Sequence, residues 1–438
     1  MSRPSGEATT AETPGDKARH RRGFWLLWLA TLISGLGDGV RFVALPLLAA
    51  TVTRDPVLIA SVTVAGQLPW VVVGPVTGVL TDRLNRRRLV WQVAVFQAVL
   101  MGVFAVSVAG GAAGVAVIAV AAFLLASSET LSLNLSAALI PELVDERRLS
   151  SANSWVQGGQ FVMSDFVGLS IGAVLFGFAP LLPFAVDSVT FAVAALLLLA
   201  MGRSGKPTEA VPKVTLAVVR ADLAEGMRWL LRHRLLRTLC GLIAVSNFAV
   251  VGVTAIAVLY ALEVLRVDRT TYGLLMVIVA VGGLAGLVTA PWLSKRLGYG
   301  GVLRVTFALM PVPFFATGLT ATPLVAAFSF FFVGASISLG NVVSISLRQE
   351  LVPAEMFGRV NSFYRLLALG LGPLGGACAG VLADRFGLHA PFLLGGALLT
   401  VTVLAAVPLL SERAVTAAKE AKAKKTKDQE AKDQVTGG

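Results

Sequence analysis

Long apolar runs separated by short polar segments fill the chain from residue 24 to residue 410. Each run is long enough to cross a hydrocarbon core of about 30 Å as a tilted helix. The apolar positions are continuous and do not alternate with polar ones, which excludes the strands of a membrane barrel. We count twelve predicted spans: 24–50, 57–80, 89–109, 113–138, 152–176, 182–201, 238–262, 272–293, 301–319, 323–346, 361–382 and 389–410.

The composition agrees with an all-α integral membrane protein. Hydrophobic residues make up 56% of the 438 residues and charged residues only 14%. The net charge of +12 could indicate a nucleic-acid partner. However, 31 of the 37 Lys and Arg residues fall on one side when the N-terminus is placed in the cytoplasm. Because cationic loops stay in the cytoplasm, both termini are expected there, and no nucleic acid is expected as a partner.

The longest connection between spans divides the chain into two sets of six. It covers residues 202–237, begins with polar residues, Gly and Pro, and ends as an amphipathic stretch with leucines on one helical face. We expect this stretch to lie at the membrane surface. The predicted organisation is a disordered tail (1–23), a six-helix half (24–201), a cytoplasmic linker (202–237), a second six-helix half (238–410) and a charged, solvated tail (411–438).

The two halves repeat each other in sequence. An offset of 208 residues aligns Asn153 with Asn361, each followed by Ser, and the same offset aligns Gly168 with Gly376. Span five therefore corresponds to span eleven, six spans later. Two six-helix halves in parallel repeat are typical of one architecture of secondary transporters.

The loop between spans two and three carries the most specific motif, G-V-L-T-D-R-L-N-R-R-R. It resembles the signature loop of the major facilitator superfamily, with Asn85 at the position of the usual Gly. The resemblance implies a conformational latch based on Asp82, whereas the simpler reading is that the arginines only keep the loop in the cytoplasm. The corresponding segment 293–301 lacks an acid. The latch candidates are Gly78, Asp82, Arg83, Arg86 and Arg87.

The chain as a whole is similar to the drug- and siderophore-export branch of that superfamily, which includes the enterobactin exporter and macrolide efflux proteins. Three passages carry the resemblance: 33–46, 224–237 and 351–362. Gly159, Gly168 and Gly172 partly match the glycine pattern of the superfamily's proton antiporters, although close helix packing alone would explain them. The resemblance implies the major facilitator fold, a bacterial cytoplasmic membrane, proton antiport and drug resistance.

Ionisable residues within spans are candidates for function because a charge in the bilayer is costly. Asp38 and Arg41 are three residues apart, share a helical face and can pair. Glu129 in span four lies at a similar depth. Because spans one and four line the central cavity in the resembled fold, the resemblance implies that the three could form one polar cluster that couples transport to protons. Asp165 shares its face with glycines and could instead face a neighbouring helix. The alternative for the cluster is a structural ion pair with no part in transport.

A few uncharged residues are candidates to contact a substrate, although core or lipid-facing positions would explain them equally well. Few charges and many apolar walls favour an amphiphilic or weakly cationic substrate. The candidates are Gln67, Trp70, Phe161, Asn247 and Tyr260.

The favoured function is therefore proton-coupled export of a small amphiphilic compound, such as an antibiotic, drug or siderophore, by a protein expected to act as a monomer. An uptake or lipid-moving carrier of the same fold and a membrane receptor or scaffold that transports nothing remain alternatives. The sequence holds no nucleophile–base set, no metal-ligand spacing and no nucleotide-binding loop, so neither an enzyme nor a cofactor is predicted. The two cysteines lie in apolar runs and indicate no disulfide framework.

Overall fold

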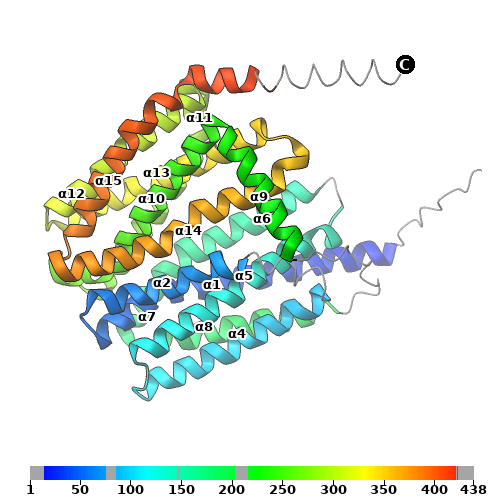
Figure 1. Ribbon diagram of the computed structural model, residues 1–438. Helices are drawn as coiled ribbons and strands as arrows, with labels where there is room; N and C mark the ends of the chain where they lie inside the picture. The colour runs from blue at the N-terminus through cyan, green and yellow to red at the C-terminus, as the bar shows by residue number, and fades with distance from the viewer. Residues whose placement is uncertain (1–13, 75–84, 146–147, 203–215, 421, 423–438) are drawn as a thin grey trace, which may run out of the picture.

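The computed structural model describes residues 14–74, 85–145, 148–202, 216–420 and 422, and all regular structure in these ranges is helical (Figure 1). The all-α membrane fold predicted from the sequence is confirmed. Helices and helical turns of the first six spans are α1 (Pro14–Val52), α2 (Pro56–Val72), α4 (Arg86–Ala109), α5 (Val115–Leu143), α6 (Leu149–Phe161), the π-helical turn η2 (Val162–Gly168), α7 (Leu169–Phe178) and α8 (Leu182–Leu199).

The rest of the chain begins with the linker helix α9 (Leu216–Arg232) and continues through the remaining spans. These elements are α10 (Arg234–Leu259), the π-helical turn η3 (Tyr260–Val264), α11 (Arg269–Leu309), α12 (Pro311–Leu319), α13 (Pro323–Leu351), α14 (Ala354–Phe386), α15 (Ala390–Ala406) and the 3₁₀ turn η4 (Val407–Leu410).

The described parts of the predicted spans lie mainly on these helices, and residues 75–80 of the second span lie outside the described residues. Among the described residues, nine helical stretches are long and apolar enough to cross a membrane, and α2 and α15 are shorter apolar helices. One of the nine runs from Arg269 to Leu319 and holds predicted spans eight and nine. It is broken at Gly298, whose φ of 69° is open to glycine but unfavourable for other residues.

Side-chain caps start several helices where the sequence turns back into the membrane. The Asp55 carboxylate accepts hydrogen bonds from the first N–H groups of α2, and Asn85 accepts one from the Arg88 N–H at the start of α4. Asn85 has extended backbone (φ −65°, ψ 104°), so this position does not use the left-handed conformation that a glycine would allow. At the start of α11, hydrogen bonds from Thr271 hold the pKa of Asp268 below its usual value.

Small residues let α1 cross the fifth span with the two backbones in contact. A Cβ atom at Gly168 would lie 2.7 Å from the Leu36 carbonyl oxygen, and one at Gly172 would lie 2.6 Å from the Val40 carbonyl oxygen. Gly39 on α1 faces the Ser164 carbonyl in the same way. Close packing, which the sequence offered as one explanation of these glycines, is what they provide.

The two sets of spans meet through α2 against α14 and through α7 against α11. We call the side with the α1–α2 loop the distal end, and the opposite side, where α1 begins and α5 ends, the terminal end (Figure 1). At the distal end, Arg54 and Glu263 approach to 3.6 Å across the two sets. Among the described helices, α5 and α6 make no extended contact with the second set.

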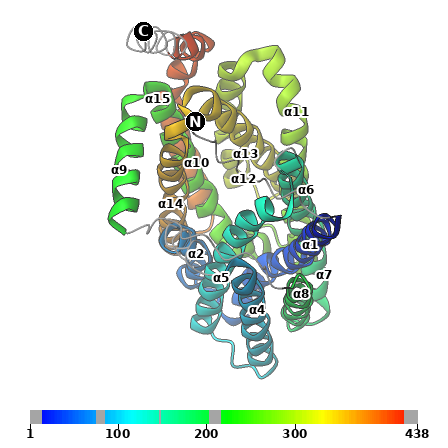
Figure 2. The ribbon, with the colours of Figure 1, turned by 90° about the vertical axis from the view of Figure 1, so that its right-hand side faces the viewer.

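The linker helix and the start of the C-terminal tail both dock on the second set of spans (Figure 2). Arg359 of α14 binds Asp222 and Glu225 of α9, at 2.9 and 2.8 Å. Residues 412–420 are helical, and the side chain of Val415 is fully buried. The Glu412 carboxylate accepts a hydrogen bond from the Gly300 N–H at 2.8 Å. The expectation of a fully solvated tail is therefore wrong for residues 412–420.

Candidate functional site

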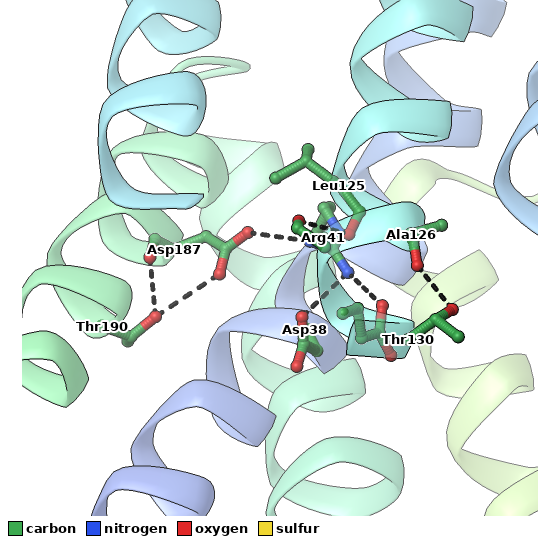
Figure 3. A network of polar contacts seen from close by, with 9 residues as sticks. Asp38, Arg41, Leu125, Ala126, Thr130, Asp187 and Thr190 are labelled. Carbon is green, nitrogen blue, oxygen red and sulfur yellow. Dashed lines mark hydrogen bonds and ion pairs between the residues drawn. The ribbon is translucent and has the colours of Figure 1, made fainter. Parts of the chain in front are cut away.

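A buried arginine joins three helices of the first set of spans. Arg41 Nη2 on α1 lies 2.8 Å from Asp38 Oδ1 on the same helix and 2.8 Å from Glu129 Oε2 on α5 (Figure 3). Only 8% of the Arg41 side chain is exposed, compared with 23% for Glu129. The structure thus brings together the three residues that the sequence grouped as one cluster.

A third acid, which the sequence analysis did not place here, completes the cluster. The Asp187 carboxylate on α8 is fully buried, and its Oδ2 lies 3.8 Å from Arg41 Nη1 (Figure 3). Asp187 lies only five residues inside α8, yet its carboxylate does not reach the membrane surface. Gly37 on α1 makes room for the buried carboxylate, since a Cβ atom at this position would collide with the Asp187 carboxylate and the Thr190 hydroxyl.

The cluster lies in a polar layer between two apolar cores. On the terminal side, one core includes Phe24, Leu139 and Leu198. On the distal side, another includes Leu47 and Phe191, and the Phe191 ring centroid lies 6.0 Å from Arg41 Cζ. Apolar side chains therefore border the cluster in both directions along the helix bundle, and its charges are stabilised largely by one another.

A small polar chamber adjoins two of the three acids. Its volume is about 30 Å³, enough for about one water molecule. Asp38 and Glu129 line it, whereas Asp187 does not. The other polar lining residues come from four helices: Thr31, Ser34, Gln97, Ser132, Ser136 and Gln160.

A larger, mostly apolar cavity lies where the two sets of spans face each other. Its volume is about 260 Å³, and α1, α6, η2, α7, α10, α11, α12, α13 and α15 contribute to its wall. Phe42, Phe161 and Phe314 supply aromatic surface, and Asp165 is the one ionisable residue in the lining. This combination of apolar walls and a single acid suits an amphiphile that carries a positive charge.

The π-helical turn η2 explains why Asp165 faces this cavity. In a regular α-helix, residues rotate by about 100° each, so Asp165 would share one face with Gly168 and Gly172. The wider π turn from Val162 to Gly168 reduces that rotation. The two glycines therefore pack against α1 while Asp165 lines the cavity.

The other predicted contact residues divide into two groups. Phe161 lines the cavity, whereas Gln67 and Trp70 on α2 are not part of its wall. Asn247 donates to the Ala368 carbonyl at 2.8 Å and ties α10 to α14. The Tyr260 hydroxyl donates to the Thr320 carbonyl at 2.9 Å and is almost fully buried. The last two thus make contacts between helices.

The candidate latch is described only in part. Gly78, Asp82 and Arg83 lie outside the described residues, so the role of Asp82 stays a prediction. Arg86 Nη1 lies 3.2 Å from Glu142 Oε1 at the end of α5, and Arg87 Nε lies 4.0 Å from Glu142 Oε2. These two arginines therefore join α4 to α5 within the first set of spans.

Comparisons with known proteins agree with this architecture. The profile of a family described as transmembrane secretion effectors matches residues 19–436. The multidrug efflux pump Tap of Mycolicibacterium fortuitum is 29% identical over 394 residues, which cover 85% of this chain and 92% of that protein. Macrolide efflux protein A of Streptococcus pyogenes is 23% identical over 399 residues, which cover 89% of this chain and 96% of that protein.

Solved transporter structures share the fold at low sequence identity. A nucleoside transporter, NupG, superposes with a TM-score of 0.71 at 12% identity and covers 89% of this chain and 99% of its own. A bacterial homologue of the iron transporter ferroportin, in an inward-facing state, gives a TM-score of 0.67 at 19% identity and covers 88% of this chain and 98% of its own.

Proposed function

Because the chain belongs to the transmembrane secretion effector family of major facilitator transporters, we propose that it exports small amphiphilic compounds by proton antiport. The observation that carries the proposal is a buried cluster of three acids and one arginine beside an apolar cavity that holds a fourth acid. The efflux proteins that resemble the chain over most of its length support the same direction of transport.

The proposed cargo is a drug-like or siderophore-like amphiphile with a cationic group. Apolar and aromatic residues of the cavity would bury its hydrophobic part. The Asp165 carboxylate would pair with its charge, and Phe42 and Phe161 would contribute cation–π contacts. One chain builds the whole cavity from its two sets of spans, so a monomer suffices.

Proton coupling is assigned to the cluster around Arg41. A carboxyl group buried beside other carboxyl groups is costly in its charged form, and a nearby arginine offsets that cost. Asp38 and Glu129 are held between these opposing influences, and both line the chamber that can hold water. A movement of Arg41 would therefore change the surroundings of both carboxyl groups at a place that water can reach.

Transport would follow from rocking of the two sets of spans about the cavity. With both chain ends in the cytoplasm, as the charge distribution predicts, the distal end would be the outer face. The contacts there between α2 and α14 and between Arg54 and Glu263 would keep that face closed, as an inward-facing state requires. Asp82 would serve as the latch of the opposite state, because the terminal end must close when the distal end opens.

The test is drug accumulation in bacterial cells that lack their own efflux pumps. Cells that express the protein should accumulate less of a lipophilic cationic dye such as ethidium, and accumulation should recover when the proton gradient is collapsed. Asp38→Asn and Glu129→Gln should abolish the difference, whereas the matched control Asp384→Asn, an exposed acid at the distal end of α14, should not. Full export by Asp38→Asn and Glu129→Gln at normal abundance would refute the proposal.

A further inference from the structure

The three acids around Arg41 differ in their access to protons. Asp38 and Glu129 line the polar chamber, and 11% and 23% of their side chains are exposed. Asp187 has no exposed surface, and the polar groups that approach its carboxylate among the described residues are Thr190 and Arg41. Protons carried by water can therefore reach Asp38 and Glu129, whereas Asp187 is sealed between α1 and α8.

In the described part of the chain, Arg41 and Asp187 face each other with an unpaired donor and an unpaired acceptor, but they are too far apart to form a hydrogen bond. The distance of 3.8 Å from Arg41 Nη1 to Asp187 Oδ2 is too long for a hydrogen bond. Both atoms are buried, and neither has a hydrogen-bond partner among the described residues. A buried donor facing a buried acceptor across this gap is costly, and a shift of about 1 Å by the guanidinium would satisfy both.

The charges of the cluster favour that shift when protons arrive. Three carboxylates and one guanidinium carry a net charge of −2 if all are ionised. The group is neutral when two carboxyl groups are protonated and the third pairs with Arg41. Because Asp38 and Glu129 are the accessible acids, the neutral arrangement leaves Asp187 as the charged partner of Arg41.

Building on the proposed antiport, we infer that Asp187 is the fixed counter-ion to which Arg41 moves when Asp38 and Glu129 bind protons. Each proton comes from water and forms an O–H bond on one carboxylate. The hydrogen bonds from Arg41 Nη2 to Asp38 and Glu129 then weaken, and one from Nη1 to Asp187 Oδ2 forms. Asp187 is thus a positioning residue for proton coupling.

Few other ionisable groups face this cluster. α4 contributes the neutral Gln97, which is almost fully buried, and α8 contributes only Asp187. From η2, Asp165 faces the neighbouring cavity, and the carboxylic C=O band of this acid would overlap with those of Asp38 and Glu129. An experiment on the cluster therefore needs Asp165 removed from both samples.

Infrared spectroscopy of the purified protein, without any substrate, tests the inference. The carboxylic C=O band of Asp38 and Glu129 is followed as the pH is lowered, in Asp165→Asn with and without Asp187→Asn. Without Asp187, protonation would leave Arg41 as an uncompensated buried cation. The pH at which the C=O band reaches half its full intensity, the midpoint of the titration, should therefore fall by about 1 to 3 units. This corresponds to a tenfold to thousandfold higher proton concentration. Thr190→Val is the matched control, because it changes the same contact without changing charge, and it should leave the midpoint in place.

An unchanged midpoint in Asp187→Asn would overturn the inference, even if thermal stability falls, because that result means a purely structural role. If the variant does not fold, structures of the unsubstituted protein at high and low pH decide. Arg41 Nη1 should approach Asp187 Oδ2 to about 3 Å at low pH, and a contact that stays at 3.8 Å would contradict the switch. A shifted midpoint without dye export would keep the switch and reject the antiport instead.

Discussion

Replacing Arg41 by Met should destabilise the protein by an amount that depends on pH. The substitution keeps a side chain of similar length but removes the only cation of the cluster. Arg41 makes two charge-assisted hydrogen bonds, each 2.8 Å long, and each contributes about 1.5–3 kcal/mol. Breaking a buried ion pair by removing one partner costs about 3–5 kcal/mol, so the free energy of unfolding should fall by about that amount at alkaline pH.

The decrease in the free energy of unfolding caused by Arg41→Met should become smaller as the pH falls. In the variant, Asp38, Glu129 and Asp187 face one another without a counter-ion, and only protonation relieves their burial. At low pH the neutral carboxyl groups no longer need the arginine, so the stability of the variant should approach that of the unsubstituted protein.

Thermal unfolding of the purified protein in detergent, at pH 6 and pH 8.5, measures this difference. Arg365→Met is the matched control, because Arg365 is an exposed arginine within a predicted span, and its effect should be small at both pH values. Adding Asp38→Asn to Arg41→Met should restore part of the stability at pH 8.5. An equal loss for Arg41→Met at both pH values would show that packing of the side chain, and not charge, decides its role.

Three further substitutions separate binding, packing and docking. Asp165→Asn should weaken binding of a cationic dye by tenfold or more, measured by fluorescence titration, while thermal stability stays unchanged; equal affinity would exclude the acid from recognition. Gly39→Leu should abolish membrane abundance on immunoblots, because its side chain would collide with the Ser164 carbonyl; normal abundance would contradict the tight crossing. Glu412→Ala leaves the Gly300 N–H without its carboxylate partner and should lower the free energy of unfolding by about 1 kcal/mol, whereas an unchanged melting temperature would mean that the tail is not docked.

Much of the fold was predictable because hydrophobicity and charge act over whole segments. The apolar runs located the spans, and the family resemblance is confirmed by the secretion effector profile. The grouping of Asp38, Arg41 and Glu129 followed from helix periodicity, from depth and from the place of spans one and four in the resembled fold.

Single contacts decide what the sequence left open. Asp187 is buried because Gly37 leaves room for its carboxylate. In the sequence, the sign of this burial was an acid that stands five residues inside an apolar span. Asp165 turns toward the cavity because of a π turn, which the residue pattern does not reveal. Tyr260 and Asn247 bond to backbone carbonyls of distant helices, and such partners are fixed only by tertiary packing.

Helix α1 connects the cluster around Arg41 with the cavity that Asp165 lines. One face carries Asp38 and Arg41, and another lies backbone to backbone against Gly168 and Gly172 on the helix that holds Asp165. Because the backbones touch, α1 and the fifth span cannot move independently at this crossing, since a tightly packed interior offers no free space for a displacement. In the proposed antiport, a tilt of α1 that begins at Arg41 would therefore displace Asp165 as well, and proton binding and cargo binding would be coupled through this one helix.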